Sequence, residues 1–145
     1  MYSVYSLADV ATTLNHPDVG RSVLSDAGGG RVTISYSGDL SSHTTTATGY
    51  VVINRLKATN GQIGLEVPQN SEADLFLRKW VSYLQNVKNT ARFALSTFVL
   101  EDPAGHKTLS MSGVTPQKKP DEGYDQTSGN RQYNLLFAEM VETTK

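Results

Sequence analysis

The sequence contains no cysteine, and this absence excludes several kinds of chemistry. A disulfide framework, a thiol nucleophile and a thiolate ligand for zinc all require a residue that the chain lacks. The three histidines, His16, His43 and His106, are far apart, and no pair has the close spacing of a zinc site. We interpret them as solvated side chains of loops or polar segments, and we expect neither a metal nor another cofactor.

Long hydrophobic runs and an excess of charge are missing as well. No apolar stretch approaches the roughly 20 residues that cross a membrane, and the N-terminus lacks the basic start and apolar core of a signal peptide. The 13 basic and 14 acidic residues are interspersed and give a net charge of −1. Because nucleic-acid-binding domains carry a basic footprint, general nucleic-acid binding is not supported, and we expect no membrane partner.

Catalytic signatures are also missing from the 145 residues. There is no Gly-x-Ser-x-Gly elbow, and Gly28-Gly29-Gly30 precedes a strand without the lysine or the helix of a phosphate-binding loop. A Ser/His/Asp triad can assemble from distant positions, so an enzyme with an unrecognised site remains the last of three alternatives. We predict that the protein is not an enzyme.

The segment Ser71–Asn86 has the pattern of an amphipathic helix. Ser71 is a suitable N-cap, and Glu72 and Asp74 place negative charge at the positive end of the helix dipole. At 100° per residue, large apolar side chains fall on one stripe that needs a surface to cover. We predict a helix over about residues 72–87 whose core face is Phe76, Leu77, Trp80, Val81 and Leu84.

Most of the remaining chain favours strands, because Ser, Thr, Gly and Asn are plentiful and apolar residues alternate with polar ones. In Arg31–Ser37, Val32, Ile34 and Tyr36 share one face and Thr33, Ser35 and Ser37 the other. An Asn60-Gly61 turn predicts a hairpin of Tyr50–Lys57 with Gln62–Val67. Further strands are expected at Ala8–Leu14, at Arg92–Glu101 and Lys107–Val114 joined by a turn at Asp102–Gly105, and at Arg131–Glu142, where Leu135–Met140 could also be helical.

Two segments are long and polar. Gly38–Gly49 is threonine-rich and is either a loop or a strand without a core face of its own, completed by another chain or by water. Thr115–Asn130 is expected to be a loop without secondary structure. The pattern as a whole predicts a mainly β (α+β) fold, a rolled antiparallel sheet or barrel with one flanking helix, in a single domain of residues 1–145.

Three stretches carry a resemblance to a known family. They are Gly49–Asn54, then Gly61–Val67 leading through Gln69-Asn70-Ser71 into the helix, and Gly129–Leu135 after a polar loop that contains Tyr124. In these stretches and in the order of its elements, the chain resembles the tail tube proteins of contractile-tailed bacteriophages. Type VI secretion tube proteins share that fold.

The resemblance implies a structural virion protein without catalytic residues. Hexameric rings would stack into a hollow tail tube, with the sheath, baseplate and tail terminator proteins as partners. Double-stranded DNA would pass through the tube without specific binding, and the protein would be made in the host cytoplasm before it enters the virion tail. A type VI-like tube subunit and a monomeric small β-barrel that binds a ligand in an apolar pocket are the alternatives.

Candidate assembly residues follow from this expectation. A channel lining needs small polar side chains, and contacts between subunits are expected in the two long polar segments. Arg31, Arg55 and Arg92 border strands and are not placed inside or outside the channel. The lumen candidates are Thr33, Ser35 and Ser37, with Thr44 and Thr46 on an adjoining strand, and the inter-subunit candidates are Ser41, Ser42, His43, Thr48, Lys118, Lys119 and Tyr124.

Overall fold

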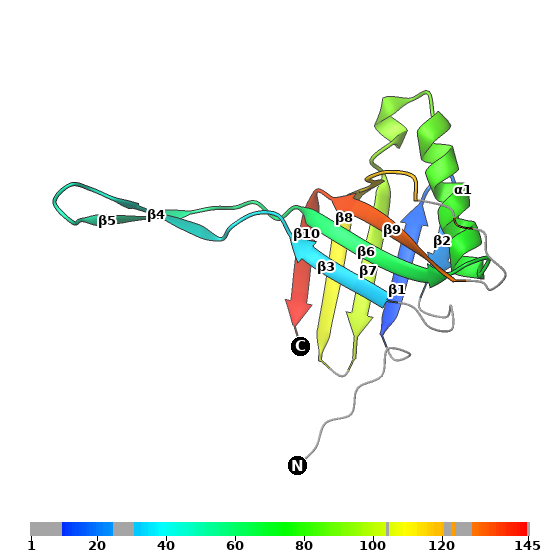
Figure 1. The fold of residues 1–145 in the computed structure, drawn as a ribbon, viewed down its shortest axis with the longest axis horizontal. Helices are drawn as coiled ribbons and strands as arrows, with labels where there is room; N and C mark the ends of the chain where they lie inside the picture. The colour runs from blue at the N-terminus through cyan, green and yellow to red at the C-terminus, as the bar shows by residue number, and fades with distance from the viewer. Residues whose placement is uncertain (1–9, 25–30, 104, 121–122, 124–128, 145) are drawn as a thin grey trace, which may run out of the picture.

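The structure is a computed structural model that describes residues 10–24, 31–103, 105–120, 123 and 129–144. Figure 1 shows an antiparallel sheet rolled over on itself, one helix beside it and a long two-stranded hairpin that leaves the body. The elements are β1 (Ala11–His16), β2 (Gly20–Val23), β3 (Arg31–Tyr36), β4 (Ser41–Thr45), β5 (Val51–Arg55), β6 (Gly61–Pro68), α1 (Glu72–Asn86), the 3₁₀ turn η2 (Thr90–Arg92), β7 (Ser96–Asp102), β8 (Lys107–Pro116), β9 (Asn130–Phe137) and β10 (Glu139–Thr144).

The main sheet has the strand order β2-β1-β7-β8-β9-β6-β3, with β10 paired to β8, and every pairing is antiparallel. In Figure 1, β3, β6 and β9 cross in front of β1, β7 and β8, so the sheet forms two layers. The predicted mainly β fold, with a rolled antiparallel sheet and one flanking helix, is therefore confirmed.

The last strands carry the chain from one layer to the other. β8 and the β9–β10 segment form one long bent hairpin, in which Thr115 faces Leu136 and Ser112 faces Glu139. At the bend, Gly113 has a φ of 65°, and a Cβ there would lie 2.8 Å from that of Ala138. Glycine is thus required at this position. The predicted last strand, 131–142, is two strands instead of one, and the helical alternative for its second half is wrong.

The core lies between the two layers and under α1. Each contributing strand buries alternate residues, as a period of two requires. The expected common face of Ile63, Leu65 and Val67 in β6 is confirmed, since all three are buried. The largest side chains that are fully buried include Leu14, Ile63, Leu65, Leu77, Trp80, Phe98, Met111, Tyr133 and Leu135.

The helix begins and ends almost where the sequence predicts. The Ser71 hydroxyl accepts a hydrogen bond from the Asp74 N–H at 3.2 Å, as an N-cap should. Of the predicted core face, Leu77, Trp80, Val81 and Leu84 are buried and Phe76 is half-buried. Trp80 donates its indole N–H to the Ser96 hydroxyl at 2.8 Å, which ties α1 to β7.

The hairpin predicted around Asn60-Gly61 is wrong. β5 pairs with β4, whereas β6 lies between β3 and β9 and is a central strand. Asn60 instead extends the β3–β6 pairing, because its carbonyl accepts the Ser37 N–H at 3.1 Å. The Asn-Gly signal is local and does not identify which distant strand offers β6 a neighbour. The Thr-rich segment also has its strand partner in the same chain, since Thr44 faces Val52.

Smaller differences concern the other segments. His16 is buried at the end of β1, where its ring accepts the Asp18 N–H at 3.0 Å and donates to the Arg92 carbonyl at 2.8 Å, so the solvated interpretation is wrong for this residue. β7 begins at Ser96, because residues 90–92 form η2. Thr115 and Pro116 belong to β8. Gly28-Gly29-Gly30 and Tyr124 lie outside the described residues.

Candidate assembly surfaces

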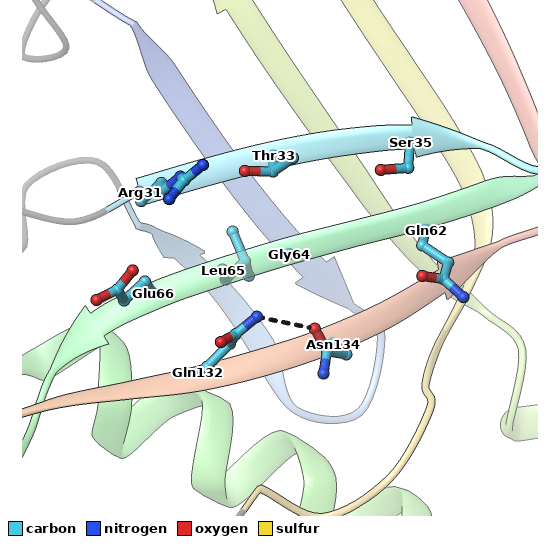
Figure 2. Close-up of a pocket in the computed structure, with 9 residues that line it drawn as sticks. All are labelled: Arg31, Thr33, Ser35, Gln62, Gly64, Leu65, Glu66, Gln132 and Asn134. Atoms are coloured by element: carbon cyan, nitrogen blue, oxygen red, sulfur yellow. Dashed lines mark hydrogen bonds between the residues drawn. The ribbon is translucent and has the colours of Figure 1, made fainter.

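The outward face of β3, β6 and β9 is polar and almost uncharged. Figure 2 shows its side chains in rows across the three strands. Strand register places Thr33 opposite Gly64, and Gly64 opposite Asn134. Thr33 and Ser35 are exposed and face away from the half-buried Val32 and Ile34, as predicted. The neighbouring rows are Arg31–Glu66–Gln132 and Ser35–Gln62–Leu136.

Within these three strands, charge on this face is confined to one end, and Lys118 borders the face beside Asn134. Arg31 and Glu66 occupy the same row, and the Glu66 carboxylate accepts a hydrogen bond from the Asn130 amide at 3.0 Å. The other rows present hydroxyls, amides, a glycine and one leucine. A surface of this kind would bind a phosphate backbone weakly, because the salt-dependent attraction to DNA comes from lysine and arginine contacts and few are present here.

Residues 39–57, which we call the arm, form the second surface. The arm contains β4 and β5 and extends away from the body on the side opposite α1 (Figure 1). The β4–β5 pair is a separate two-stranded sheet, and all but one of the arm residues are exposed. Ile53 and Tyr50 expose 70% and 68% of their surface. Among the described residues the arm has no packing partner, and isolated two-stranded hairpins are only marginally stable in water.

The two faces of the arm differ. On one face the Asn54 amide donates to the hydroxyls of Ser42 at 3.3 Å and Thr44 at 3.1 Å. Alternation places Val51, Ile53 and Arg55 on the other face, together with His43 of β4. One face of the arm therefore carries hydroxyls and an amide joined by hydrogen bonds, with Val52 beside them, and the other face carries exposed apolar and basic side chains.

The structure separates the candidate residues. Ser41, Ser42 and His43 lie on β4, and Thr48 lies in the turn at the tip of the arm, all of them exposed. Lys118 and Lys119 lie on the body after β8, where Lys119 lines a shallow groove beside α1. The two sets of inter-subunit candidates are thus not brought together within one chain.

Thr44 and Thr46 do not adjoin β3. Thr44 is in β4, which pairs only with β5, and Thr46 is in the arm tip, where its hydroxyl contacts that of Thr48 at 3.1 Å. The adjoining-strand prediction is wrong for both. Ser37 follows β3 in the stretch that leads to the arm. Of the five lumen candidates, only Thr33 and Ser35 share the polar face of the sheet.

The boundary arginines lie at three different places. Arg31 starts β3 on the polar face, and Arg55 ends β5 on the arm. Arg92 ends η2, and its guanidinium lies 3.8 Å from the Asp18 carboxylate. They do not form one basic patch.

A buried ion pair that the sequence did not reveal anchors α1 to β9. Asp74 and Arg131 are both buried, with their charged atoms 3.1 Å apart, and Tyr133 donates its hydroxyl to Asp74 at 2.7 Å. Arg78, one turn along the helix, also contacts Asp74 at 2.9 Å, and the Asn70 N–H donates to it at the same distance. Sequence alone places Asp74 at the helix start but does not identify its partner 57 residues away.

The electrostatics of this cluster are coupled. Burial by itself would raise the pKa of Asp74, but hydrogen bonds from Arg78, the Asn70 N–H and Tyr133, with the charge of Arg131, hold it below the usual value. For Tyr133, burial and the hydrogen bond to Asp74 raise the pKa to about 12. The cluster fixes the position of α1 relative to the sheet, and its groups all have partners, so its arrangement is structural.

Membrane-spanning helices and clusters of metal ligands are both absent from the described residues. None of the helices in this part of the chain is both long and apolar enough to cross a bilayer. Within the same residues, no group of three His, Cys, Asp or Glu side chains is placed to hold a metal ion.

Similar structures are found among contractile injection systems. The anti-feeding prophage tube-terminating cap matches with a TM-score of 0.61 and 9% identity, over 100% of this chain and 93% of that chain. The sheath/tube terminator of an extracellular contractile injection system, PVC, gives 0.60 and 10%, over 99% of both chains. A chain of the PVC sheath-tube complex gives 0.57 and 12%, over 98% and 93%. At these identities the likeness shows the fold alone.

The family comparison is more specific. No curated protein sequence matches the chain. The family model described as "Bacteriophage PhiTE tail tube protein" matches residues 2–143. This match covers nearly the whole chain and agrees with the resemblance seen in the sequence and with the rolled sheet and flanking helix. The chain therefore belongs to the PhiTE tail tube protein family of bacteriophages.

Proposed function

We propose that the protein assembles into hexameric rings that stack into the hollow tube of a contractile phage tail. The virion DNA passes through this tube without specific binding. The protein is a non-enzymatic virion component, made in the host cytoplasm, and its partners are the tail sheath, baseplate and tail terminator proteins. Similar chains occur in a sheath-tube complex, a baseplate and a terminating cap, which supports these partners.

The arm carries this proposal. A ribbon of two strands with exposed Leu40, Tyr50 and Ile53 gains stability only when another molecule covers it. In a closed ring or a stack of rings the same contact between subunits repeats, so a neighbouring subunit can cover the arm of every subunit. A monomeric protein would expose the arm, with its apolar side chains and unpaired strand edges, as an aggregation site.

The polar face of β3, β6 and β9 is the proposed channel lining. Thr33 and Ser35, with Gln62, Gln132 and Asn134, present neutral groups to a passing duplex. Thr44 and Thr46 are assigned with the arm to subunit contacts instead. The single basic residue among the side chains that Figure 2 draws is Arg31, in the row that also holds Glu66.

Lysine at the channel lining should make the tube retain DNA. We expect the combined variant Thr33→Lys, Ser35→Lys and Asn134→Lys to form tubes that bind duplex DNA and release it slowly. Each phosphate contact should add about 0.9 to the slope of log affinity against log salt. The measurement is DNA retention by purified tubes at several salt concentrations, with Ser82→Lys on the exposed face of α1 as control. Tubes of the triple variant that hold no more DNA than the control would place this face outside the channel.

Removing the arm should abolish assembly without unfolding the body. The chain passes close to itself at the base of the arm, where a Cβ on Gly38 would lie 2.7 Å from that of Ala58. A short glycine linker can therefore join these two residues in place of 39–57. Removing only Ser41–Thr48 would leave β5 without its partner strand, so the effect of this shorter deletion on assembly would be harder to interpret. We expect rings and tubes of the wild type by negative-stain electron microscopy, and folded monomers of the arm-less chain by gel filtration and circular dichroism.

The outcomes of this experiment are distinct. Rings of the arm-less chain would show that ring contacts lie elsewhere. A wild-type protein that stays monomeric at high concentration and with its virion partners would favour the small ligand-binding barrel. The filled interior, with Trp80, Tyr133 and Phe98 fully buried, argues against that alternative, because a ligand needs space between the layers. The family match to a phage tail tube favours the phage assignment over a type VI-like tube.

A further inference from the structure

The layer formed by β10, β8, β7, β1 and β2 has an outward face that the proposed channel does not use. Successive strand registers join one straight row across all five strands. Val141, at one end of this row, is 65% exposed, and Val23, at the other end, is 43% exposed. The row reads Val141, Ser110, Val99, Thr13, Val23. A flat stripe of small and β-branched side chains is thus open to an incoming strand pair.

Carboxylates flank this valine row on both sides. Glu101 lies two residues beyond Val99 on β7, and Glu139 lies two residues before Val141 on β10. Both are exposed. The remaining outward positions of β10, β8 and β7 in the described chain are Ser, Thr and Val, with no cation among them. The part of the face on β10, β8 and β7 is therefore acidic around an apolar centre, and the exposed Arg21 lies at the β2 end of the row that holds Glu139.

The arm has the opposite charge and the same spacing. The arm contains Arg55 and Lys57, and its single acidic residue, Asp39, lies at its base. Ile53 and Arg55 lie on one face, two residues apart, as do Val99 and Glu101, and alternate residues of a strand are separated by about 6.6–6.8 Å in each case. If Ile53 of the arm lies on the valine row, Arg55 lies over a neighbouring row of the sheet. Each neighbouring row contains a glutamate, Glu101 or Glu139, so Arg55 meets a row with a carboxylate in either direction of the arm.

We infer that this outward face of β10, β8 and β7 receives the arm of a second copy of the chain. Its own arm cannot occupy it, because the arm extends away from the body (Figure 1). Two sheets pack face to face about 10 Å apart, so the arm lies as a small second sheet on this layer with its apolar and basic face inward. The inference rests on the proposed self-assembly and names the surface that carries it.

Charge exchange tests the assignment. The variant Arg55→Glu and the double variant Glu101→Lys/Glu139→Lys should each raise the lowest protein concentration that gives tubes by at least about tenfold, since like charges would face each other. The combination of all three should return it to within about threefold of wild type, because the pair is restored with reversed sign. Lys79→Glu and Glu72→Lys, exposed on α1, are matched controls without effect.

Cross-linking gives a second readout that does not depend on charge. Because the chain has no cysteine, Ile53→Cys and Val99→Cys introduce the only thiols. A short bismaleimide should join these positions between copies and give a ladder of covalent oligomers. A chain with Leu75→Cys on α1 in place of Val99→Cys should give none.

The results separate the two proposals. Absence of any wild-type assembly would contradict the proposed function itself. If the wild type forms tubes but the charge reversals leave the concentration needed for tubes unchanged, only the proposed binding of the arm to this face is overturned. The same holds if the triple variant does not return that concentration towards the wild-type value. Ladders of equal yield from the Ile53–Val99 and Ile53–Leu75 cysteine pairs would overturn it too.

Discussion

Replacing Asp74 by alanine is expected to lower the free energy of unfolding by about 3–5 kcal/mol, because Arg131 would keep its buried charge without its partner. The two charged groups lie 3.1 Å apart, and both side chains are buried. Asp74→Leu with Arg131→Met should recover part of the loss, since no buried charge remains unpaired, while the Tyr133 hydroxyl and the Asn70 N–H still lose their acceptor. The measurement is urea unfolding followed by circular dichroism, at a concentration where the protein is monomeric.

An exposed ion pair provides the control for this prediction. Lys107 and Glu142 contact each other at 3.0 Å with side chains 41% and 43% exposed, so Lys107→Ala should cost less than about 1 kcal/mol. A loss at Asp74 as small as this one would mean that Arg131 is reached by water. In that case the buried anchor of α1 would not exist.

The pH dependence of stability should identify the same carboxylate. The folded state holds the pKa of Asp74 below its usual value, so the unfolded chain binds more protons in acid. The stabilisation is therefore complete above the ordinary pKa of about 4 and is lost as pH falls through the lower folded pKa. The Asp74→Ala variant should lack this part of the acid decline. On the alkaline side, the raised pKa of Tyr133, about 12, predicts loss of stability between about pH 10 and 12.

Trp80→Ala is expected to destabilise the protein by about 3–5 kcal/mol, the cost of truncating a large aromatic side chain in a packed core. Trp80 is fully buried, and its indole N–H is bonded to a Ser96 hydroxyl that is itself buried. The alanine would leave both a cavity and an unsatisfied hydroxyl between α1 and β7. Circular dichroism is the suitable probe, because the variant has lost the only tryptophan.

Leu75→Ala is the control on the same helix, because Leu75 is 53% exposed and should cost less than about 1 kcal/mol. In the wild-type protein, Trp80 fluorescence should be blue-shifted and resist quenching by iodide. Emission typical of an exposed indole would contradict the burial of α1 against the sheet.

The sequence by itself determined the elements whose signals are local. The N-cap, the early acids and the 3.6-residue stripe of Ser71–Asn86 lie within one segment, so α1 was predicted to within a residue or so. The alternation of β3 and β6 likewise fixed which side chains face the core, including Ile63 and Leu65. The family resemblance rested on β6 and the start of α1 together with 49–54 and 129–135, and it is confirmed by the match over residues 2–143.

Apart from the β7–β8 hairpin, which its turn predicted, the neighbours of the strands were decided by the tertiary structure, because most pairings join residues far apart in the sequence. The Asn60-Gly61 signal suggested a wrong partner for β6. β5 was assigned to β6 but pairs with β4, so that the segment left open as a loop or a strand without a core face is one strand of the arm. Asp74 was expected at a helix dipole, yet two of its partners, Arg131 and Tyr133, come from β9. His16 was expected in water and is buried, since β1 brings both of its ring nitrogens to backbone partners. For Asp74 and His16 the deciding contacts include partners far away in the sequence, whose geometry exists only once the layers pack together, whereas β4–β5 is a local hairpin without an Asn-Gly signal.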